Sequence, residues 1–255
     1  MLLKDKVGLV TGGGDGIGRA TAQMFARDGA RVAVADIRLG AAEETVELIR
    51  AEGGDALALE TDVSSESAVA QMVDAVISHY GRLDCACNNA AGGGGFNRVP
   101  DVTEESWDRC QSITLKGVWL SMKYEIPAML SSGGGAIVNI ASLSGVRGEA
   151  LQSPYSAAKG GVIALTRTAA AEYAQQGIRV NAINPGAILT RALANYIDTV
   201  PGAREHTVGT HAMRRFGQPE EIADAVVYLC SERSSFVTGH SLNVDGGVMV
   251  NPHTL

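Results

Sequence analysis

The stretch Val7-Gly8-Leu9-Val10-Thr11-Gly12-Gly13-Gly14-Asp15-Gly16-Ile17-Gly18 decides the fold of this chain. Its first five residues form a short apolar run that predicts a buried strand, and the glycines that follow break this strand in a turn. A helical pattern continues from Arg19 to Asp28, and a second strand is predicted at residues 31–36. A strand, a helix and a strand in this order form the repeating unit of a parallel sheet.

The glycine turn predicts a binding site for a dinucleotide. A turn of this kind at the start of a helix presents free backbone N–H groups and the positive end of the helix dipole, which suits a pyrophosphate. The spacing of Gly12, Gly16 and Gly18 is G-x-x-x-G-x-G. Asp36 ends the next strand, roughly 20 residues beyond the turn, where a carboxylate can accept hydrogen bonds from an adenosine ribose.

Two acidic residues favour NAD over NADP as the cofactor. Asp36 would repel the 2′-phosphate that distinguishes NADP, and Asp15 inside the turn is expected to add to that repulsion. No Lys or Arg occupies the turn before Arg19. Arg38 argues in the other direction, because a nearby arginine sometimes accommodates the phosphate. NADP therefore stays open as the alternative.

Strands and helices alternate along the whole chain without a linker, so residues 1–255 are predicted to form one domain. Residues 104–129 are expected to form one long helix. Residues 187–217 are expected to be an irregular substrate lid, because so long a connection usually has such a role. The other helices are expected at residues 41–52, 66–79, 160–174 and 219–230, and the other strands at residues 56–60, 83–88, 136–140, 178–183 and 242–244.

The composition is that of a globular protein with a sizeable core, since 45% of the residues are hydrophobic and 19% are charged. A formal net charge of −7 argues against a nucleic-acid or acidic-membrane partner. No apolar run is long enough to span a bilayer, and the first residues lack the apolar core of a signal peptide. The cysteines lack metal-ligand spacing, so we expect no metal site and instead buried free thiols in a reducing cytoplasm: Cys85, Cys87, Cys110 and Cys230.

Tyr155 and Lys159 stand four residues apart, and a helix would place both side chains on one face. A nearby ammonium favours the phenolate, so Lys159 is expected to lower the pKa of Tyr155 below its ordinary value of about 10. Such a tyrosine can give or take a proton near neutral pH. Ser142 and Asn89 each follow a predicted strand, so both should lie with the glycine turn at the carboxyl ends of the strands.

Six motifs follow one another along the chain: Thr11-Gly-Gly-Gly-Asp-Gly-Ile-Gly18, Asn88-Asn-Ala90, Ser142, Tyr155-x-x-x-Lys159, Asn184-Pro-Gly186 and Asp245-Gly-Gly247. Together they resemble the short-chain dehydrogenase/reductase family, and the resemblance covers nearly the whole chain. It implies an α/β fold: a single Rossmann-like domain built as a three-layer sandwich, with a seven-stranded parallel sheet and helices on both faces.

The resemblance also implies roles for individual residues. Tyr155 would exchange a proton with the substrate oxygen, Lys159 would hold the nicotinamide ribose and lower the pKa of Tyr155, and Ser142 would orient the substrate. The resemblance implies a pyrophosphate turn formed by Gly12, Ile17 and Gly18, and an adenine pocket formed by Asp62 and Val63. It also implies that Asn89 supports the cofactor after the fourth strand. Ile188 and Thr190, which follow Pro185-Gly186, would form a clamp for the carboxamide.

The chain departs from the family pattern in two places. The family usually has Asn-Ala-Gly after the fourth strand, where this chain has Asn89-Ala90-Ala91 and then four glycines. Many members also carry a catalytic Asn on the long helix, in an Asn-Leu-x-Gly-Val pattern. Here the matching run is Thr114-Leu-Lys-Gly-Val118. Thr114 is the candidate for the same catalytic place, because its hydroxyl can bond a water; alternatively it only packs in the helix.

These features predict an NAD-dependent oxidoreductase that interconverts a secondary alcohol and a ketone. The apolar residues of the lid and the few charges near Ser142 favour a small, uncharged substrate that is cyclic or hydrophobic, with Glu149, Leu151 and Gln152 lining the entrance. Two alternatives stay open, an NADP-dependent ketone reductase of biosynthesis and a non-catalytic NAD-binding regulator. The intact catalytic set argues against a pure binder.

A homotetramer is also expected, partly from the resemblance. The helix at residues 104–129 and the helix after Tyr155 carry apolar or small residues on more than one face, so each can serve both the core and a partner. The segment at residues 241–255 is apolar enough to make a second contact. Pairing of identical surfaces at both contacts would give a tetramer with D₂ symmetry.

Overall fold

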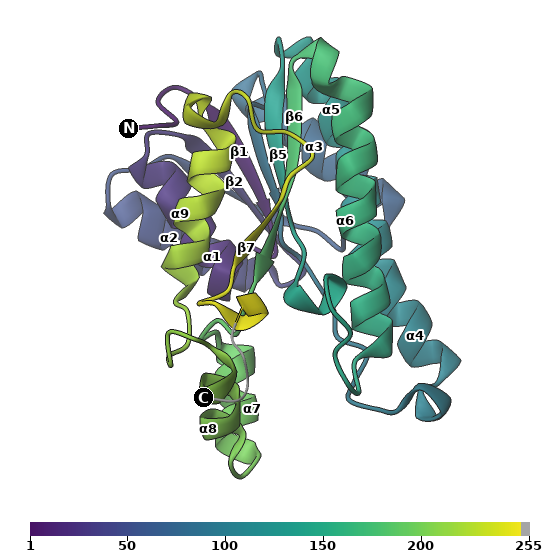
Figure 1. The fold of residues 1–255 in the computed structure, drawn as a ribbon. Helices are drawn as coiled ribbons and strands as arrows, with labels where there is room; N and C mark the ends of the chain where they lie inside the picture. The colour runs from purple at the N-terminus through teal and green to yellow at the C-terminus, as the bar shows by residue number, and fades with distance from the viewer. Residues whose placement is uncertain (251–255) are drawn as a thin grey trace.

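The computed structural model describes residues 1–250, and in this part of the chain a seven-stranded parallel sheet runs through the centre of the molecule (Figure 1). The strand order is β3-β2-β1-β4-β5-β6-β7. Helices cover both faces, which explains why the strands read as nearly continuous apolar runs. The strands are β1 (Val7–Thr11), β2 (Arg31–Asp36), β3 (Ala56–Glu60), β4 (Cys85–Asn88), β5 (Gly135–Ile140), β6 (Ile178–Pro185) and β7 (Ser241–Val244).

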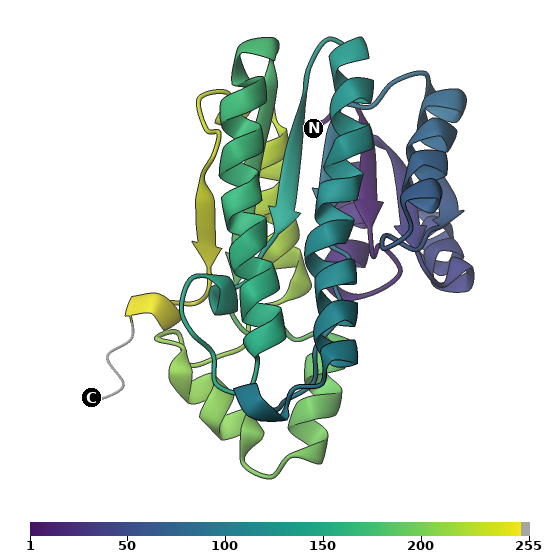
Figure 2. The same cartoon turned by 90° about the vertical axis from the view of Figure 1, so that its right-hand side faces the viewer.

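The helices form the two outer layers of the predicted three-layer sandwich. Figure 2 shows three of them side by side across one face of the sheet. Each layer buries its own apolar core against the strands. The helices are α3 (Glu66–Tyr80), α5 (Gly117–Ser131) and α6 (Ser153–Tyr173) on one face, and α1 (Gly16–Arg27), α2 (Leu39–Ala51) and α9 (Pro219–Cys230) on the other.

The direction in which the sheet grows changes between β1 and β4. From β1 it continues through β2 to β3, and from β4 it continues through β5 and β6 to β7 on the other side. Ligands of open parallel sheets bind outside the carboxyl ends of the strands at such a switch point. The glycine turn follows β1 and Asn89 follows β4, so the sequence brings both predicted elements to this place.

The predicted long helix at residues 104–129 is a continuous helical run whose geometry changes in the middle. α4 (Glu104–Gln111) passes into a turn of π-helix, η2 (Ser112–Lys116), and then into α5. Ser112 and Gly117, at the two junctions, keep right-handed helical backbone angles, so the run does not break. π-helical turns inside α-helices are frequent at functional sites, and this one contains Thr114.

The predicted lid is more regular than expected. Residues 187–217 contain two short helices, α7 (Arg191–Thr199) and α8 (Ala203–Thr210), which lie beyond the carboxyl ends of the strands (Figures 1 and 2). Thr190 caps α7, because its hydroxyl accepts a hydrogen bond from the backbone N–H of Leu193. A small apolar cluster separate from the two main cores holds these helices together, and its buried members are Ile197, Ala203 and Phe216.

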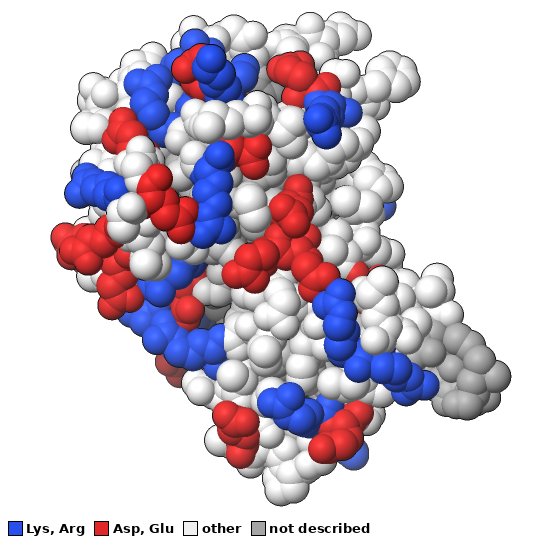
Figure 3. All heavy atoms as spheres, turned by 90° about the vertical axis from the view of Figure 1, so that its left-hand side faces the viewer, with Lys and Arg blue, Asp and Glu red and all other residues white. Residues whose placement is uncertain are grey.

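The charges are mixed over the face formed by α1, α2 and α9. Figure 3 shows positive and negative side chains interspersed there, without a broad patch of one sign. Among residues 1–250, the helices are all too short or too polar to cross a membrane.

Candidate active site

The glycine turn after β1 is built for close approach of its backbone to a ligand. Gly12 has a positive φ of 62°, which favours glycine. A side chain at Gly18 would collide with the carbonyl oxygen of Gly12, so the turn folds back tightly on the start of α1. Asn89 supports the turn from β4, since its Nδ2 donates to the carbonyl oxygens of Thr11 and Gly12, each at 3.1 Å.

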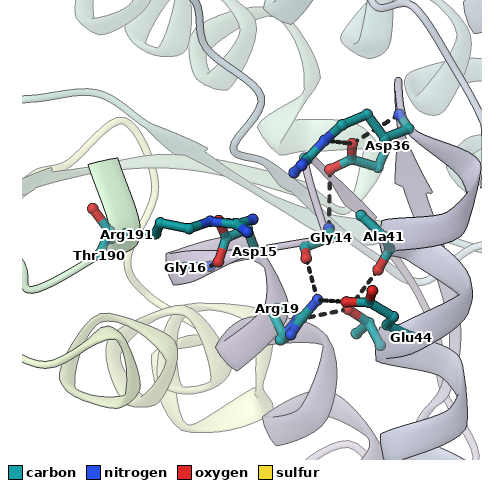
Figure 4. Close-up of polar contacts among 12 residues, drawn as sticks. Gly14, Asp15, Gly16, Arg19, Asp36, Ala41, Glu44, Thr190 and Arg191 are labelled. Carbon is teal, nitrogen blue, oxygen red and sulfur yellow. Dashed lines mark hydrogen bonds and ion pairs between the residues drawn. The ribbon is translucent and has the colours of Figure 1, made fainter. Parts of the chain in front are cut away.

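Asp36 lies directly against the glycine turn, as the sequence predicts. Its carboxylate is buried and accepts hydrogen bonds from the backbone N–H groups of Gly14 and Arg38, both at 3.0 Å (Figure 4). The guanidinium of Arg38 lies 3.8 Å from the same carboxylate. Arg19 also reaches this side of the turn, because its Nη2 donates to the carbonyl oxygen of Gly14 at 2.5 Å. The predicted ribose site therefore has one buried acid and two nearby arginines.

Asp15 is placed differently from the expectation. It caps α1 by accepting from the N–H of Gly16, and it forms an ion pair with Arg191, whose Nε lies 2.7 Å from its carboxylate. Figure 4 shows Asp15 directed toward Arg191 and away from Asp36. Arg191 offsets the charge of Asp15, and the contribution of Asp15 to the repulsion of a 2′-phosphate stays a prediction. Asp15 also connects the glycine turn to the first residue of the lid helix α7.

Ser142, Tyr155 and Lys159 come together as predicted. Tyr155 and Lys159 lie one turn apart on α6, which starts at Ser153 and so includes both residues. The Nζ atom of Lys159 lies 5.5 Å from the centre of the Tyr155 ring, and it donates to the carbonyl oxygen of Ile140 at 2.5 Å. Ser142 follows β5, and its hydroxyl acts on the phenol of Tyr155 by lowering the pKa of that group.

Close packing fixes the distance between Ser142 and α6. Ser142 begins the short 3₁₀ turn η3 (Leu143–Gly145), and its hydroxyl accepts from the N–H of Ser144 at 3.1 Å. A side chain at Gly145 would lie 2.6 Å from the backbone of Lys159, so only glycine allows this turn to touch the helix. The close contact keeps the serine hydroxyl beside the phenol.

Burial reverses the expected direction of the tyrosine pKa. Partial loss of contact with water raises the pKa of Tyr155 to about 12, although the Ser142 hydroxyl lowers it. The same loss of water lowers the pKa of Lys159 to about 8, and its side chain is 1% exposed. The expectation that the pKa of Tyr155 lies below about 10 is therefore wrong for the protein without a bound cofactor.

Thr114 is fully buried and bonded to the glycine run after β4. Its hydroxyl donates to the carbonyl oxygen of Gly92 at 2.9 Å and accepts from the N–H of the same residue at 3.0 Å. A hydroxyl can donate one hydrogen bond, and Thr114 donates it to the carbonyl oxygen of Gly92. The geometry therefore fixes the position of the glycine run.

The lid begins on the opposite side of the site from α6. Gly186 continues from β6 and donates to the carbonyl oxygen of Val244 at 3.1 Å. Thr190 lies against the glycine turn, since a side chain added at Gly16 would meet its methyl group at 2.9 Å. Ile188 is buried and pairs with Gly217 at the far end of the lid. The predicted clamp residues are thus brought beside the predicted pyrophosphate turn.

The two predicted adenine-pocket residues differ in exposure. Asp62 is exposed at the carboxyl end of β3 and accepts hydrogen bonds from the N–H and hydroxyl of Ser64. Val63 is 7% exposed and packs against Gly117 in the core. The residue before them, Thr61, donates its N–H to the carbonyl oxygen of Asp36 at 2.9 Å, which places both near the predicted ribose site.

Sequence reasoning did not single out His211 or Arg191. His211 is 2% exposed; its Nε2 accepts from the N–H of Ala187 at 3.1 Å, and its Nδ1 lies 2.8 Å from the carbonyl oxygen of Thr207. These partners require a neutral ring with its proton on Nδ1, which fixes the start of the lid. Partners so distant along the chain leave no local signal in the sequence.

The residues at the switch point fit a dinucleotide. The first N–H groups of α1 lack partners within the helix and open onto the glycine turn. A side chain at Gly14 would lie 2.8 Å from the carboxylate of Asp36. Glycine at this position therefore leaves the backbone of the turn uncovered next to the carboxylate. Within residues 1–250, no group of three or more His, Cys, Asp or Glu side chains is arranged to hold a metal ion.

A family model described as enoyl-(acyl carrier protein) reductase, which belongs to the short-chain dehydrogenases/reductases, matches residues 12–249. The chain belongs to the short-chain dehydrogenase/reductase family. Membership confirms the resemblance read from the six motifs and makes the protein an oxidoreductase of this family. The seven-stranded parallel sheet with helices on both faces is the fold that the resemblance implied.

Curated members of the short-chain dehydrogenase/reductase family resemble the chain over almost its whole length. Cyclohexanol dehydrogenase of Acinetobacter sp. (strain SE19) is 43% identical over 242 residues, which cover 95% of this chain and 94% of that protein. A 2,5-dichloro-2,5-cyclohexadiene-1,4-diol dehydrogenase of Sphingobium indicum is 42% identical over 246 residues and covers 96% and 97% of the two chains.

A solved structure of the same family matches the fold closely. A 7α-hydroxysteroid dehydrogenase in complex with NADH and 7-oxo glycochenodeoxycholic acid superposes with a TM-score of 0.91 and 36% identity. The match covers 96% of this chain and 94% of that one. The short-chain dehydrogenase/reductase fold of this chain is therefore one on which a reduced nicotinamide dinucleotide binds.

Proposed function

We propose that the protein is an NAD(H)-dependent dehydrogenase that interconverts a secondary alcohol and a ketone on a small, uncharged ring compound. The observation that carries the proposal is the placement of Tyr155 and Lys159 one turn apart on α6, with the turn after Ser142 packed against that helix, together with a glycine turn whose backbone bonds to Asp36. A nicotinamide dinucleotide bound at the turn supplies hydride transfer to or from the substrate carbon.

The protein's own residues then have to bind the substrate oxygen and move one proton. Ser142 holds the oxygen by a hydrogen bond next to Tyr155. In oxidation the Tyr155 oxygen accepts the hydroxyl proton of the alcohol, and in reduction it returns a proton to the forming alcohol oxygen. Lys159 holds its charge near the phenol from a position fixed by the carbonyl oxygen of Ile140. We assign Thr114 a positioning role on the glycine run, in place of the catalytic role expected from the sequence.

NAD is the proposed cofactor because Asp36 is buried against the turn and still has free lone pairs. Each carboxylate oxygen accepts one backbone hydrogen bond, from Gly14 or from Arg38, and a carboxylate has about four acceptor positions in all. The remaining positions suit the two ribose hydroxyls of NAD. NADP stays as the alternative because Arg19 and Arg38 flank the same place.

The substrate class rests on the lid and on the relatives. The lid helices present apolar side chains, and Leu189 and Leu193 pack with the small cluster at the carboxyl end of the sheet. The two similar curated dehydrogenases are named for six-membered ring alcohols. At the entrance, Glu149 is neutralised by Arg147 at 3.3 Å, so it does not call for a cationic substrate.

Two further expectations belong to the proposal. The four cysteines are all buried and free, which suits a reducing cytoplasm. A homotetramer suits the exposed apolar side chains on the outer helices, such as Trp119 on α5 and Tyr228 on α9. The second predicted contact, at residues 241–255, extends into residues 251–255, which lie outside the described residues.

The test is oxidation of a panel of secondary alcohols with NAD, followed by the absorbance of the reduced cofactor. Cyclohexanol, cyclopentanol and open-chain alcohols of the same carbon number form the core of the panel. We expect reduced cofactor with the ring alcohols and its loss in Tyr155→Phe. Binding of NAD without turnover of any alcohol or ketone would instead support the non-catalytic regulator.

A further inference from the structure

We propose that Phe96 and Tyr196 form an aromatic gate across the substrate cleft and select compact apolar rings as substrates. Their rings are stacked, with centroids 5.6 Å apart and planes inclined by 20°. Phe96 follows the glycine run 92–95, and Tyr196 lies on the lid helix α7. The inference rests on the proposed function and names the residues that determine its substrate class.

Phe96 belongs to the wall that carries the proton-transfer residues. The glycine run before it passes next to α6, since a side chain at Gly94 would lie 2.7 Å from Pro154, the neighbour of Tyr155. The N–H of Asn97 donates to the carbonyl oxygen of Leu151 at 3.0 Å. These contacts place the Phe96 backbone on the Tyr155 side of the cleft.

Tyr196 belongs to the opposite wall. It lies on α7, whose capping residue Thr190 packs against Gly16 and whose first residue Arg191 is paired with Asp15. The base of this helix is therefore attached to the dinucleotide turn. In Figure 1, α7 and the segment that leads into α4 lie on two sides of the carboxyl end of the sheet. The stacked rings join these two segments, and we place the entrance of a substrate held by Tyr155 beneath them.

The exposure of the pair shows that neither ring is needed to fill the core. Phe96 is 61% exposed and Tyr196 is 38% exposed, and the pair does not belong to any of the apolar core clusters formed by residues 1–250. Aromatic rings offer large rigid apolar faces with few rotatable bonds. A flat or chair-like ring can bury its surface against such faces, whereas a flexible open chain must lose more conformational freedom to do so. The gate therefore favours ring substrates.

The gate is tested by the ratio of kcat/KM for cyclohexanol to that for 2-hexanol. Phe96→Ala and Tyr196→Ala should each lower this ratio about tenfold, mainly through a higher KM for cyclohexanol. The double variant should lose little more than either single variant, because residues in contact act as one unit. Tyr196→Phe keeps the ring and should stay within about twofold of the unchanged protein.

Two controls separate the gate from damage elsewhere. The Kd of NAD, measured by calorimetry, should change less than about twofold in the alanine variants if the turn and the base of the lid are intact. Phe236→Ala removes another exposed aromatic ring, far from the site among the loops at the amino ends of the strands, and should leave the ratio unchanged. If an alanine variant fails to fold, Phe96→Leu and Tyr196→Leu replace it and should also lower the ratio.

The outcomes distinguish the gate from the proposed function. An unchanged protein that oxidises both alcohols, with a ratio that stays the same in the alanine and leucine variants, overturns the gate and leaves the proposed function standing. An unchanged protein that oxidises neither alcohol overturns both. A lowered ratio with intact NAD binding supports the gate.

Discussion

Replacement of Asp36 by alanine should remove the preference for NAD over NADP, and the size of this effect follows from the structure. The carboxylate of Asp36 is buried and held by two backbone N–H groups at 3.0 Å, so it cannot turn away from an incoming phosphate. Two unit charges 4 Å apart interact by about 4 kcal/mol at the effective dielectric of a protein surface site. Arg38, with its Nε 3.8 Å from the carboxylate, offsets part of this repulsion.

The net preference for NAD over NADP should therefore be at least tenfold in kcat/KM, or about 1.4 kcal/mol. Asp36→Ala removes the repulsion and leaves Arg19 and Arg38 beside the ribose site, so the preference should fall to near unity or reverse. Asp36→Asn is the matched control, since it keeps the shape of the side chain and removes its charge, although one of the two backbone N–H groups of Gly14 and Arg38 loses its acceptor. It should lose most of the discrimination while keeping one acceptor oxygen for the turn.

The assay is steady-state oxidation of one secondary alcohol with each cofactor, at saturating alcohol. Thermal unfolding of each variant checks that the glycine turn survives, because a hydrogen bond to a charged group is worth about 1.5–3 kcal/mol. Equal efficiency with both cofactors in the unchanged protein would refute the reasoning. So would an Asp36→Ala variant that is folded and still discriminates as strongly as before.

Three further predictions concern other groups. Tyr155→Phe should keep NAD binding and cut turnover by roughly 10²–10⁴-fold, the usual contribution of general acid–base catalysis, in the alcohol assay. Arg191→Ala should weaken NAD binding to about the same extent as Asp15→Asn, and the double variant should be no worse than either, because the two residues form one ion pair; additive losses in calorimetry would contradict this. Glu125 is buried on α5, and loss of contact with water raises its pKa from 4.5 to about 7. Between these pH values the folded protein holds a proton that the unfolded chain releases, so the free energy of unfolding falls as pH rises from about 4.5 to about 7. Glu125→Gln should therefore raise Tm near pH 8 and have little effect near pH 5, and an equal change at both pH values would exclude titration of Glu125 as the cause.

The parts of the site that could be predicted are those with a local sequence signal. The glycine turn, Asp36 and the Tyr155–Lys159 pair each follow from spacing along one strand or helix. The ion pair of Asp15 and Arg191 joins residues 176 positions apart, and the stacking of Phe96 on Tyr196 also joins residues that are remote in sequence. Contacts of this kind depend on how residues 187–217 pack on the rest of the protein, and no periodic pattern in the sequence predicts them.

The lid itself was missed as regular structure for a related reason. α7 and α8 have nine and eight residues, and their apolar positions face a small cluster of their own in place of the main core. Helices this short are marginal without tertiary contacts, and of the two only α7 shows a clear amphipathic pattern, which a length of nine residues made easy to take for an irregular segment. The N-cap Thr190 was the one local sign of a helix start in this segment.

The pKa of Tyr155 shows a different limit, because a sequence gives the neighbours of a group but not its access to water. Lys159 stands where the spacing predicts, yet burial raises the pKa of Tyr155 to about 12 and lowers that of Lys159 to about 8. Near pH 8 the lysine has thus lost about half of the charge that would favour the phenolate. The positive charge that brings the phenol into a useful range must then come in part with the bound oxidised cofactor. It follows that proton transfer at Tyr155 is coupled to occupation of the dinucleotide site, which a pH titration of Tyr155 with and without NAD would detect as a lower pKa in the complex.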